Sequence, residues 1–361
     1  MIMVKQQFRS SRFGLGFITL LLLLVSGLRS VTAIPQNVDE MSSSGLAVPP
    51  NMAVVVNGGT ERSISTIDTA TDTAFGPFLY GMLGAPVTEL LDVVVTPDGN
   101  TAIVSNFADR RLCFINLTSS PPSLLGSVIL PIRPADLALS PDGRFVLVTS
   151  GAAATAVFSV DVARRSLVAQ LNLTGGKHAE AVAIAPDGQT VLVADTEGSQ
   201  IHMLQLNPNG TLSETQTSIS VDGRPVNVAI SPDGKTAVVS NCLTPDGRSV
   251  SDTVTILRLD SLVKTGTISG LPRFQQGAVF TPDGTKVLVI SIVPTPDQLS
   301  ILNVAGPGMV TDSGQRVDLL SNTGGFYGVD VIAVAPDGTK AYVGNPGGGD
   351  VASRVAVIDL T

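Results

Sequence analysis

The sequence predicts an all-β fold, a seven-bladed β-propeller of four-stranded antiparallel blades, on three observations. A Pro-Asp-Gly tripeptide recurs in register six times, with successive prolines 44, 45, 46, 50 and 54 residues apart. Short apolar stretches stand at fixed positions around every copy. From Gly45 to Thr361 the chain divides into seven such units. Four short strands in each repeat of about 45 residues are typical of propeller blades.

The tripeptide predicts a tight turn, because Pro fixes φ, Asp bonds its own backbone and Gly accepts a positive φ. The in-register copies with their preceding residue are Thr96–Gly99, Ser140–Gly143, Ala185–Gly188, Ser231–Gly234, Thr281–Gly284 and Ala335–Gly338. A further copy, Thr244–Gly247, is out of register, and we expect it in a loop.

Each turn is expected to join the first and second strands of its unit. Apolar first strands such as LDVVV and VIAV precede the turns, and second strands such as TAIVSN and KAYVGN follow them. Third strands (RLCFINL to RVAVIDL) come next, with weaker fourth strands in four units (LLGSVILP, LVAQLNL, TQTSISV and KTGTISG). The inner strands are apolar at consecutive positions, as expected if neighbouring blades cover both faces. A β-solenoid is the alternative, but its coils are usually shorter.

The two ends of the repeat array predict how the ring closes. Residues 45–57 form a degenerate first unit with a shortened turn, so that the propeller spans residues 45–361. The last unit ends at its third strand, residues 354–360. We expect Ile34–Met41, within an N-terminal segment of residues 34–44, to supply the closing outer strand and leave no open edge.

The N-terminus resembles an export signal. A basic segment ending at Arg12 precedes the uncharged apolar run Phe13–Leu28, and small residues lead to Ala33. The run is shorter than the ~20 residues that span a bilayer. We therefore predict that residues 1–33 are a signal peptide cleaved near Ala33. The protein would be secreted or extracytoplasmic (periplasmic or extracellular), monomeric and not embedded in a membrane; an uncleaved anchor is the alternative.

Charge and motifs exclude several functions. The chain carries 22 Lys+Arg against 30 Asp+Glu, a net charge of −8. An acidic chain is a poor nucleic-acid binder, because that function needs clustered bases. No zinc motif, GxSxG elbow or haem-attachment motif occurs, so we expect no metal and no cofactor. A Ca²⁺ site built from converging carboxylates is the alternative. Cys113 and Cys242 lie in different repeats and are expected to be unpaired.

Counting back from each motif proline identifies equivalent positions on the face opposite the turns, around the central channel. The candidate ligand-binding residues there are Arg133, Lys177, His178, Arg224, Arg273 and Tyr327. A local cluster of bases in an acidic protein predicts a pocket for a small anionic or carbonyl-bearing ligand. In the alternative, acids five or six residues before the prolines neutralise the bases. These acids are Asp92, Asp136, Glu180 and Asp330.

Three segments resemble the YVTN β-propeller repeat: Ala102–Asn106, Lys340–Asn345 and Ser63–Thr69. The resemblance covers essentially all of the chain after residue 33. It implies a seven-bladed exported propeller of the YncE-like or surface-layer type, related to lactonase-like propellers. Such a resemblance is specific for the fold and weak for activity.

Two functions remain open. The first is a non-catalytic binding scaffold whose upper face holds a protein, a cell-envelope component or a small anion. The second is a lactonase-like hydrolase, in which the arginines hold the substrate carboxylate and stabilise the oxyanion. His178 or Glu180 would then act as the base. His202 lies within a third strand, where we expect a packed or surface side chain.

Overall fold

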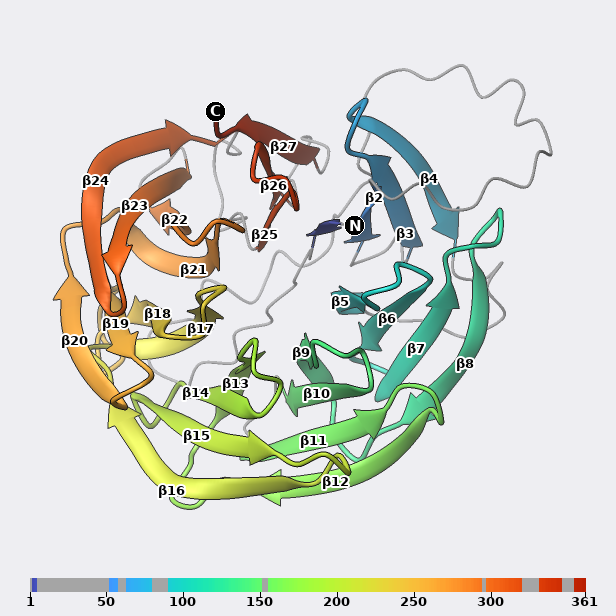
Figure 1. Cartoon of the computed structure of the whole chain (residues 1–361), viewed down its shortest axis with the longest axis horizontal. Coiled ribbons are helices and arrows are strands. Elements are labelled where there is room, and N and C mark those ends of the chain that lie inside the picture. Colours follow the sequence, from blue (N-terminus) through green and yellow to red (C-terminus); the bar gives the residue numbers. More distant parts are fainter. Residues whose placement is uncertain are drawn as a thin grey trace.

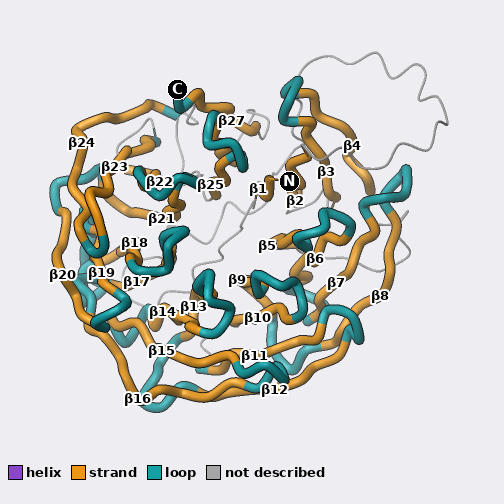
Figure 2. Tube along the Cα trace, viewed as in Figure 1, coloured by secondary structure: helices purple, strands orange, loops and turns teal. Residues whose placement is uncertain are grey.

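The structure is a computed structural model, and it describes residues 2–4, 52–57, 63–79, 90–150, 155–293, 297–319, 331–345 and 354–361. The described elements are all β-strands, arranged as successive sheets around a central axis (Figure 1). Figure 2 shows these strands joined by short turns, with no helix in the described part of the chain. The all-β seven-bladed propeller predicted from the repeats is confirmed.

Seven sheets follow one another along the chain, and each runs outward from the axis. Blade 1 comprises β1 (Ile2–Val4), β2 (Met52–Asn57), β3 (Ser63–Asp68) and β4 (Thr73–Leu79), and blade 2 comprises β5 (Leu90–Val95), β6 (Thr101–Asn106), β7 (Arg111–Asn116) and β8 (Ser123–Ile129). Blade 3 comprises β9 (Pro134–Leu139), β10 (Phe145–Ser150), β11 (Ala156–Asp161) and β12 (Ser166–Asn172), and blade 4 comprises β13 (Ala179–Ile184), β14 (Thr190–Asp195), β15 (Gln200–Leu206) and β16 (Leu212–Ser220). Blade 5 comprises β17 (Arg224–Ile230), β18 (Thr236–Leu243), β19 (Val254–Arg258) and β20 (Val263–Ile268), and blade 6 comprises β21 (Arg273–Phe280), β22 (Lys286–Val293), β23 (Gln298–Gly306) and β24 (Met309–Asp318). Blade 7 comprises β25 (Val331–Val334), β26 (Lys340–Asn345) and β27 (Arg354–Asp359).

The Pro-Asp-Gly motif forms the expected turn between the first two strands. In blade 2 the Gly99 N–H donates to the Thr96 carbonyl (2.8 Å), and the Thr96 hydroxyl donates to Asp98 Oδ1 (2.6 Å). Gly99 has a φ of +76°, which a side chain would disfavour. The out-of-register copy forms the same turn in the connection between β18 and β19, with Gly247 donating to the Thr244 carbonyl (2.8 Å).

These turns also pack one blade against the next. A Cβ built on Gly188 would lie 3.7 Å from Cδ of Pro141, the proline of the preceding turn. The glycines of the later turns face the preceding prolines in the same way, at 3.5–3.7 Å. At Gly143 the approach to Pro97 is much closer, 2.7 Å. The motif therefore makes an inter-blade contact as well as a turn.

A buried apolar cluster lies at each of the seven interfaces between neighbouring blades. Successive residues of one strand serve opposite interfaces: Ala102 and Val104 face blade 1, whereas Ile103 faces blade 3. Because both faces of each sheet are covered, the strands are apolar at consecutive positions. The predicted reason for that pattern is confirmed.

The ring closes between blades 7 and 1. Tyr342 on β26 is fully buried and packs with Val55 and Ile67 of blade 1. Its hydroxyl donates to Asp72 Oδ1 (2.9 Å), and Lys340 Nζ lies 2.7 Å from Asp72 Oδ2. Burial and the neighbouring Asp72 carboxylate raise the pKa of Tyr342 above its usual range, so the phenol stays protonated and keeps this hydrogen bond.

The N-terminal residues bear on the predicted signal peptide and the predicted closing strand. β1 pairs in parallel with β2, with Ile2 opposite Ala53, so that residues 2–4 form the inner strand of blade 1. Cleavage near Ala33 would remove this strand. The closing strand expected at Ile34–Met41 and the apolar run Phe13–Leu28 lie outside the described residues. Cys113 and Cys242 are both buried, and no disulfide joins them, as predicted.

Candidate functional site at the channel mouth

The predicted bases of four consecutive blades lie at equivalent ends of their inner strands. Arg133 immediately precedes β9, Lys177 and His178 immediately precede β13, Arg224 begins β17 and Arg273 begins β21. These inner strands succeed one another around the axis (Figure 1). Each runs from this end to a Pro-Asp-Gly turn, so the bases lie on the face opposite the turns. Tyr327 lies outside the described residues.

The four cationic side chains lack a close carboxylate partner among the described residues, although Arg224 interacts electrostatically with Asp246. Arg133, Lys177 and Arg273 are exposed and Arg224 is half-buried, and none of them forms an ion pair within the described ranges. Arg133 lies over the Phe107 ring, 5.4 Å from its centroid, which holds the guanidinium by a cation–π contact. The mouth therefore gathers cationic side chains on an acidic protein.

The guanidinium of Arg224 packs against the out-of-register turn. A Cβ on Gly247 would lie 2.4 Å from Arg224 Cζ, so a side chain at this position would displace the guanidinium. Arg224 Nε is buried and has no hydrogen-bond partner in the described part of the chain. A buried donor without a partner costs free energy, which a bound oxygen atom would recover.

Two of the acids expected to neutralise the bases, Asp92 and Asp136, accept backbone hydrogen bonds from the next blade. Asp92 is fully buried and accepts the backbone N–H of Leu137 in the next blade (2.7 Å). Asp136 accepts the N–H of Val182 in the same way (2.8 Å). Both acids thus connect the inner strands of adjacent blades and form no ion pair with the four bases. Neutralisation of the bases by the other predicted acids stays a prediction, and Asp330 lies outside the described residues.

The two candidate catalytic residues lie together. His178 Nε2 is 3.0 Å from Glu180 Oε2, and both side chains are largely buried, at 16% and 12% exposed. The His178 N–H donates to Asp195 Oδ1 (2.8 Å), and the His178 carbonyl accepts the N–H of Thr196 (3.0 Å). A carboxylate at this distance from an imidazole can orient the ring. The pair has the composition of a general base with its orienting group.

Sequence reasoning missed the environment of the second histidine. A packed or a surface side chain was expected for His202 on β15. The side chain is buried, and it lies between two carboxylates. Its Nδ1 is 3.1 Å from Glu214 Oε1, and its Nε2 is 3.5 Å from Asp195 Oδ2. A register shift between β15 and β16, within His202–Leu204, accompanies this arrangement. A two-residue register shift has no sequence signal, so the pairing was not predictable.

The charges of this group follow from its geometry. Burial opposes ionisation of all three side chains, but their mutual hydrogen bonds prevail. The pKa of His202 is raised by Asp195 and Glu214. The pKa of Asp195 is lowered by His202, Gln200 and the backbone N–H groups of His178 and Gly198. The pKa of Glu214 is lowered by Thr174 and His202.

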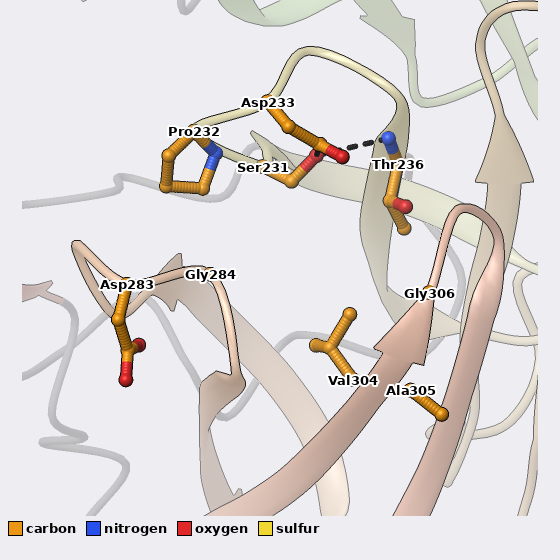
Figure 3. A pocket seen from close by; sticks show the side chains of 9 residues that line it. All are labelled: Ser231, Pro232, Asp233, Thr236, Asp283, Gly284, Val304, Ala305 and Gly306. Carbon is orange, nitrogen blue, oxygen red and sulfur yellow. Dashed lines mark hydrogen bonds between the residues drawn. The ribbon is translucent and has the colours of Figure 1, made fainter.

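The described residues also form a depression on the opposite face, but its Asp233 carboxylate is used by the turn itself. A depression of about 410 Å³ lies between the turns of blades 5 and 6, on the opposite face (Figure 3). Its Asp233 accepts the Ser231 hydroxyl (2.5 Å) and the Lys235 N–H (3.0 Å), so the turn itself uses this carboxylate. No group of three or more His, Cys, Asp or Glu side chains in the described ranges is arranged to hold a metal ion. Nor does this part of the chain contain a helix long and apolar enough to cross a membrane.

Comparison with known proteins supports the fold and a lactonase-like relationship. A family model described as "Lactonase, 7-bladed beta-propeller" matches residues 116–230, which include Arg133, His178 and Arg224. No curated protein matches the chain. The YncE-like and surface-layer part of the predicted resemblance is not reached by these matches and stays a prediction.

Several solved structures are similar in fold. A functionally unknown protein from Desulfotomaculum acetoxidans is 18% identical, with a TM-score of 0.69 over 86% of this chain and 99% of that one. Hydrazine synthase of Kuenenia stuttgartiensis is 22% identical, with a TM-score of 0.60 over 74% and 76%. A candidate 6-phosphogluconolactonase from Bacteroides fragilis is 16% identical, with a TM-score of 0.61 over 85% and 97%. At these identities the likeness concerns the fold alone.

Proposed function

We propose that this protein is an exported binding propeller whose channel mouth holds a small anion bearing a carboxylate or phosphate group. The observation that carries the proposal is a set of four bases at equivalent ends of the inner strands of blades 3–6, none of which forms an ion pair within the described ranges, in a chain of net charge −8. Clustered charge of one sign in a concave site raises the local concentration of the opposite ion.

The residue types fit an oxyanion better than a neutral ligand. Arginine presents parallel N–H donors that match two oxygens of a carboxylate or phosphate, whereas lysine supplies a point charge. Arg224 is the central candidate, because its buried Nε lacks a partner among the described residues and its guanidinium packs against Gly247. Arg133 lies one blade before Lys177 and Arg224 one blade after it, so that a ligand would be held from both sides.

Anion binding is tested by calorimetry with gluconate, 6-phosphogluconate and sulfate. The matched variants are Arg133→Ala and Arg144→Ala: each arginine lies over a phenylalanine ring, at 5.4 Å and 5.0 Å, but Arg144 belongs to a turn on the opposite face. We expect Arg133→Ala and Arg224→Ala to weaken binding at least tenfold, and Arg144→Ala to leave it unchanged. Equal losses in all three variants, or no binding by the wild type, would refute the proposal.

Lactone hydrolysis is the second candidate, favoured by the His178–Glu180 pair and the lactonase match over residues 116–230. His178 would take a proton from water as the water oxygen attacks the lactone carbonyl, with Glu180 orienting the imidazole. It would return this proton to the ring oxygen of the lactone as the bond between that oxygen and the carbonyl carbon breaks. The arginines would stabilise the oxyanion and then bind the carboxylate that ring opening releases. A pH-stat assay with 6-phosphogluconolactone tests this reaction. If His178→Gln hydrolyses the lactone as fast as the wild type, the idea is wrong.

We also propose export and a monomeric state, on the N-terminal signal and the closed ring. Intact mass of protein recovered outside the cytoplasm should correspond to a chain that begins at Ile34. Recovery of the full-length chain in a membrane fraction would favour the uncleaved anchor. Cell-envelope components and other proteins remain candidate partners of the same face.

A further inference from the structure

The loop that carries Lys177 and His178 is held at both ends by carboxylates of its own blade. Glu214 on β16 accepts the N–H of Thr174, with its two oxygens at 3.1 Å and 3.3 Å. Asp195 at the end of β14 accepts the N–H groups of Lys177 (3.2 Å) and His178 (2.8 Å). Three backbone donors of residues 174–178 therefore depend on two acidic side chains.

His202 lies between these two acids and is only 3% exposed. Its Nδ1 lies next to Glu214 (3.1 Å), and its Nε2 lies next to Asp195 (3.5 Å) and Gln200 Nε2 (3.1 Å). Gln200 Nε2 also donates to Asp195 Oδ2 (3.0 Å). The side chains of blade 4 thus form a continuous polar chain from the outer strand β16 to the channel mouth.

We propose that His202 is a positioning residue for the anion site: with Asp195 and Glu214 it forms a buried charge chain that fixes the Thr174–His178 loop, and its protonation state sets how firmly that loop is held. The inference rests on the proposed function, because it states how the same site is regulated. Its structural part, control of the loop by His202, can be tested without a ligand.

The two protonation states of His202 have different hydrogen bonds. An imidazolium donates from both ring nitrogens and connects Glu214 with Asp195. Its Nε2 then no longer accepts from the Gln200 amide, which keeps its hydrogen bond to Asp195. The neutral ring donates from one nitrogen only. If Nδ1 keeps its proton for Glu214, then Nε2 accepts from Gln200, and Asp195 loses the charged neighbour that balances it.

The sign of the effect follows from the groups that face His202. Asp195 on β14 and Glu214 on β16 both favour the charged ring, whereas burial opposes it. On the far side of Asp195 lie Lys177 and His178, with Glu180 on β13 next to His178. The pKa of His202 is raised, so the loop is held firmly below about pH 6.5, the ordinary value for histidine. The hold weakens as the pH rises through the raised value.

Hydrogen exchange of the peptide that covers residues 173–178 tests the loop. We expect His202→Phe to raise its exchange about tenfold at pH 6, because hydrogen bonds to charged groups are lost. His202→Gln keeps one hydrogen-bond donor and carries no charge. We expect its exchange at residues 173–178 to lie between those of the wild type and His202→Phe. We also expect that the protection of this peptide in His202→Gln does not change with pH in the way that it does in the wild type. Met203→Leu is the matched control, since Met203 lies on the same strand and is 4% exposed.

Affinity for gluconate between pH 6 and 8.5 tests the regulation, because gluconate stays ionised over this range. We expect affinity to fall several-fold with rising pH in the wild type and in the control Met203→Leu, and to be independent of pH in His202→Gln.

The outcomes separate the two proposals. If no anion binds to the wild type, the proposed function fails, while exchange still decides whether His202 holds the loop. If His202→Phe lowers the unfolding midpoint without changing exchange of residues 173–178, His202 only fills the core and the inference is overturned. If His202→Gln keeps the wild-type pH dependence of affinity, the regulatory part is overturned.

Discussion

The Pro-Asp-Gly turns offer a direct test of inter-blade packing through two glycines with the same backbone. Gly143 and Gly188 both have a φ of +71° and stand at the same motif position. They differ in their surroundings. A Cβ on Gly143 would lie 2.7 Å from Pro97 Cδ, whereas a Cβ on Gly188 would lie 3.7 Å from Pro141 Cδ. Substitution by alanine therefore separates the backbone cost from the packing cost.

The magnitudes follow from these distances. A left-handed conformation costs an L-residue about 1–2 kcal/mol, and alanine returns about 0.4–1 kcal/mol by restricting the unfolded chain. We expect Gly188→Ala to lower the free energy of unfolding by about 1 kcal/mol. Gly143→Ala adds the overpacking of a rigid proline ring, about 1–3 kcal/mol more. The two variants should thus differ by about 2 kcal/mol.

Urea unfolding followed by circular dichroism measures both variants, since the chain has no Trp for fluorescence. A Pro97→Ala background supplies the control, because removing the ring should reduce the cost of Gly143→Ala to that of Gly188→Ala. If the two alanine variants are equally stable, or if the cost at Gly143 is the same with and without the Pro97 ring, the stacking argument is wrong.

Three further predictions concern the hydrogen bond from Leu137 to Asp92 between blades, the protonation of His202 and the N-terminal residues 34–44. Asp92→Ala should lower the free energy of unfolding by about 1–3 kcal/mol, because the Leu137 N–H is left unpaired in a buried interface; Asp92→Asn keeps an acceptor oxygen and should cost less in the same urea assay. The raised pKa of His202 means that its contribution to stability is complete below about pH 6.5 and is lost as the pH rises through the raised value. Thermal midpoints of wild type should therefore fall with pH in this range, and those of His202→Gln should fall less. Deleting residues 34–44 should leave the outer edge of β27 open and promote self-association, measurable by sedimentation; an unchanged monomer would count against the closing strand.

Sequence was sufficient for the architecture because the signals for it are local. The turn chemistry of Pro-Asp-Gly lies within four residues, and the predicted second strands over residues 101–106, 145–150, 190–195 and 340–345 match β6, β10, β14 and β26. Repetition then fixed the number of blades and the face on which equivalent residues lie. The bases of the channel mouth were found by this counting alone.

Tertiary structure decided what individual side chains do, because their partners come from neighbouring blades or depend on a register shift. The role of Asp92 depends on an amide 45 residues away, at Leu137. The setting of His202 involves an irregular pairing of β15 with β16. The repeat pattern predicts where a residue lies in the ring. Packing between blades determines which atoms surround that residue, and the repeat pattern does not predict this packing.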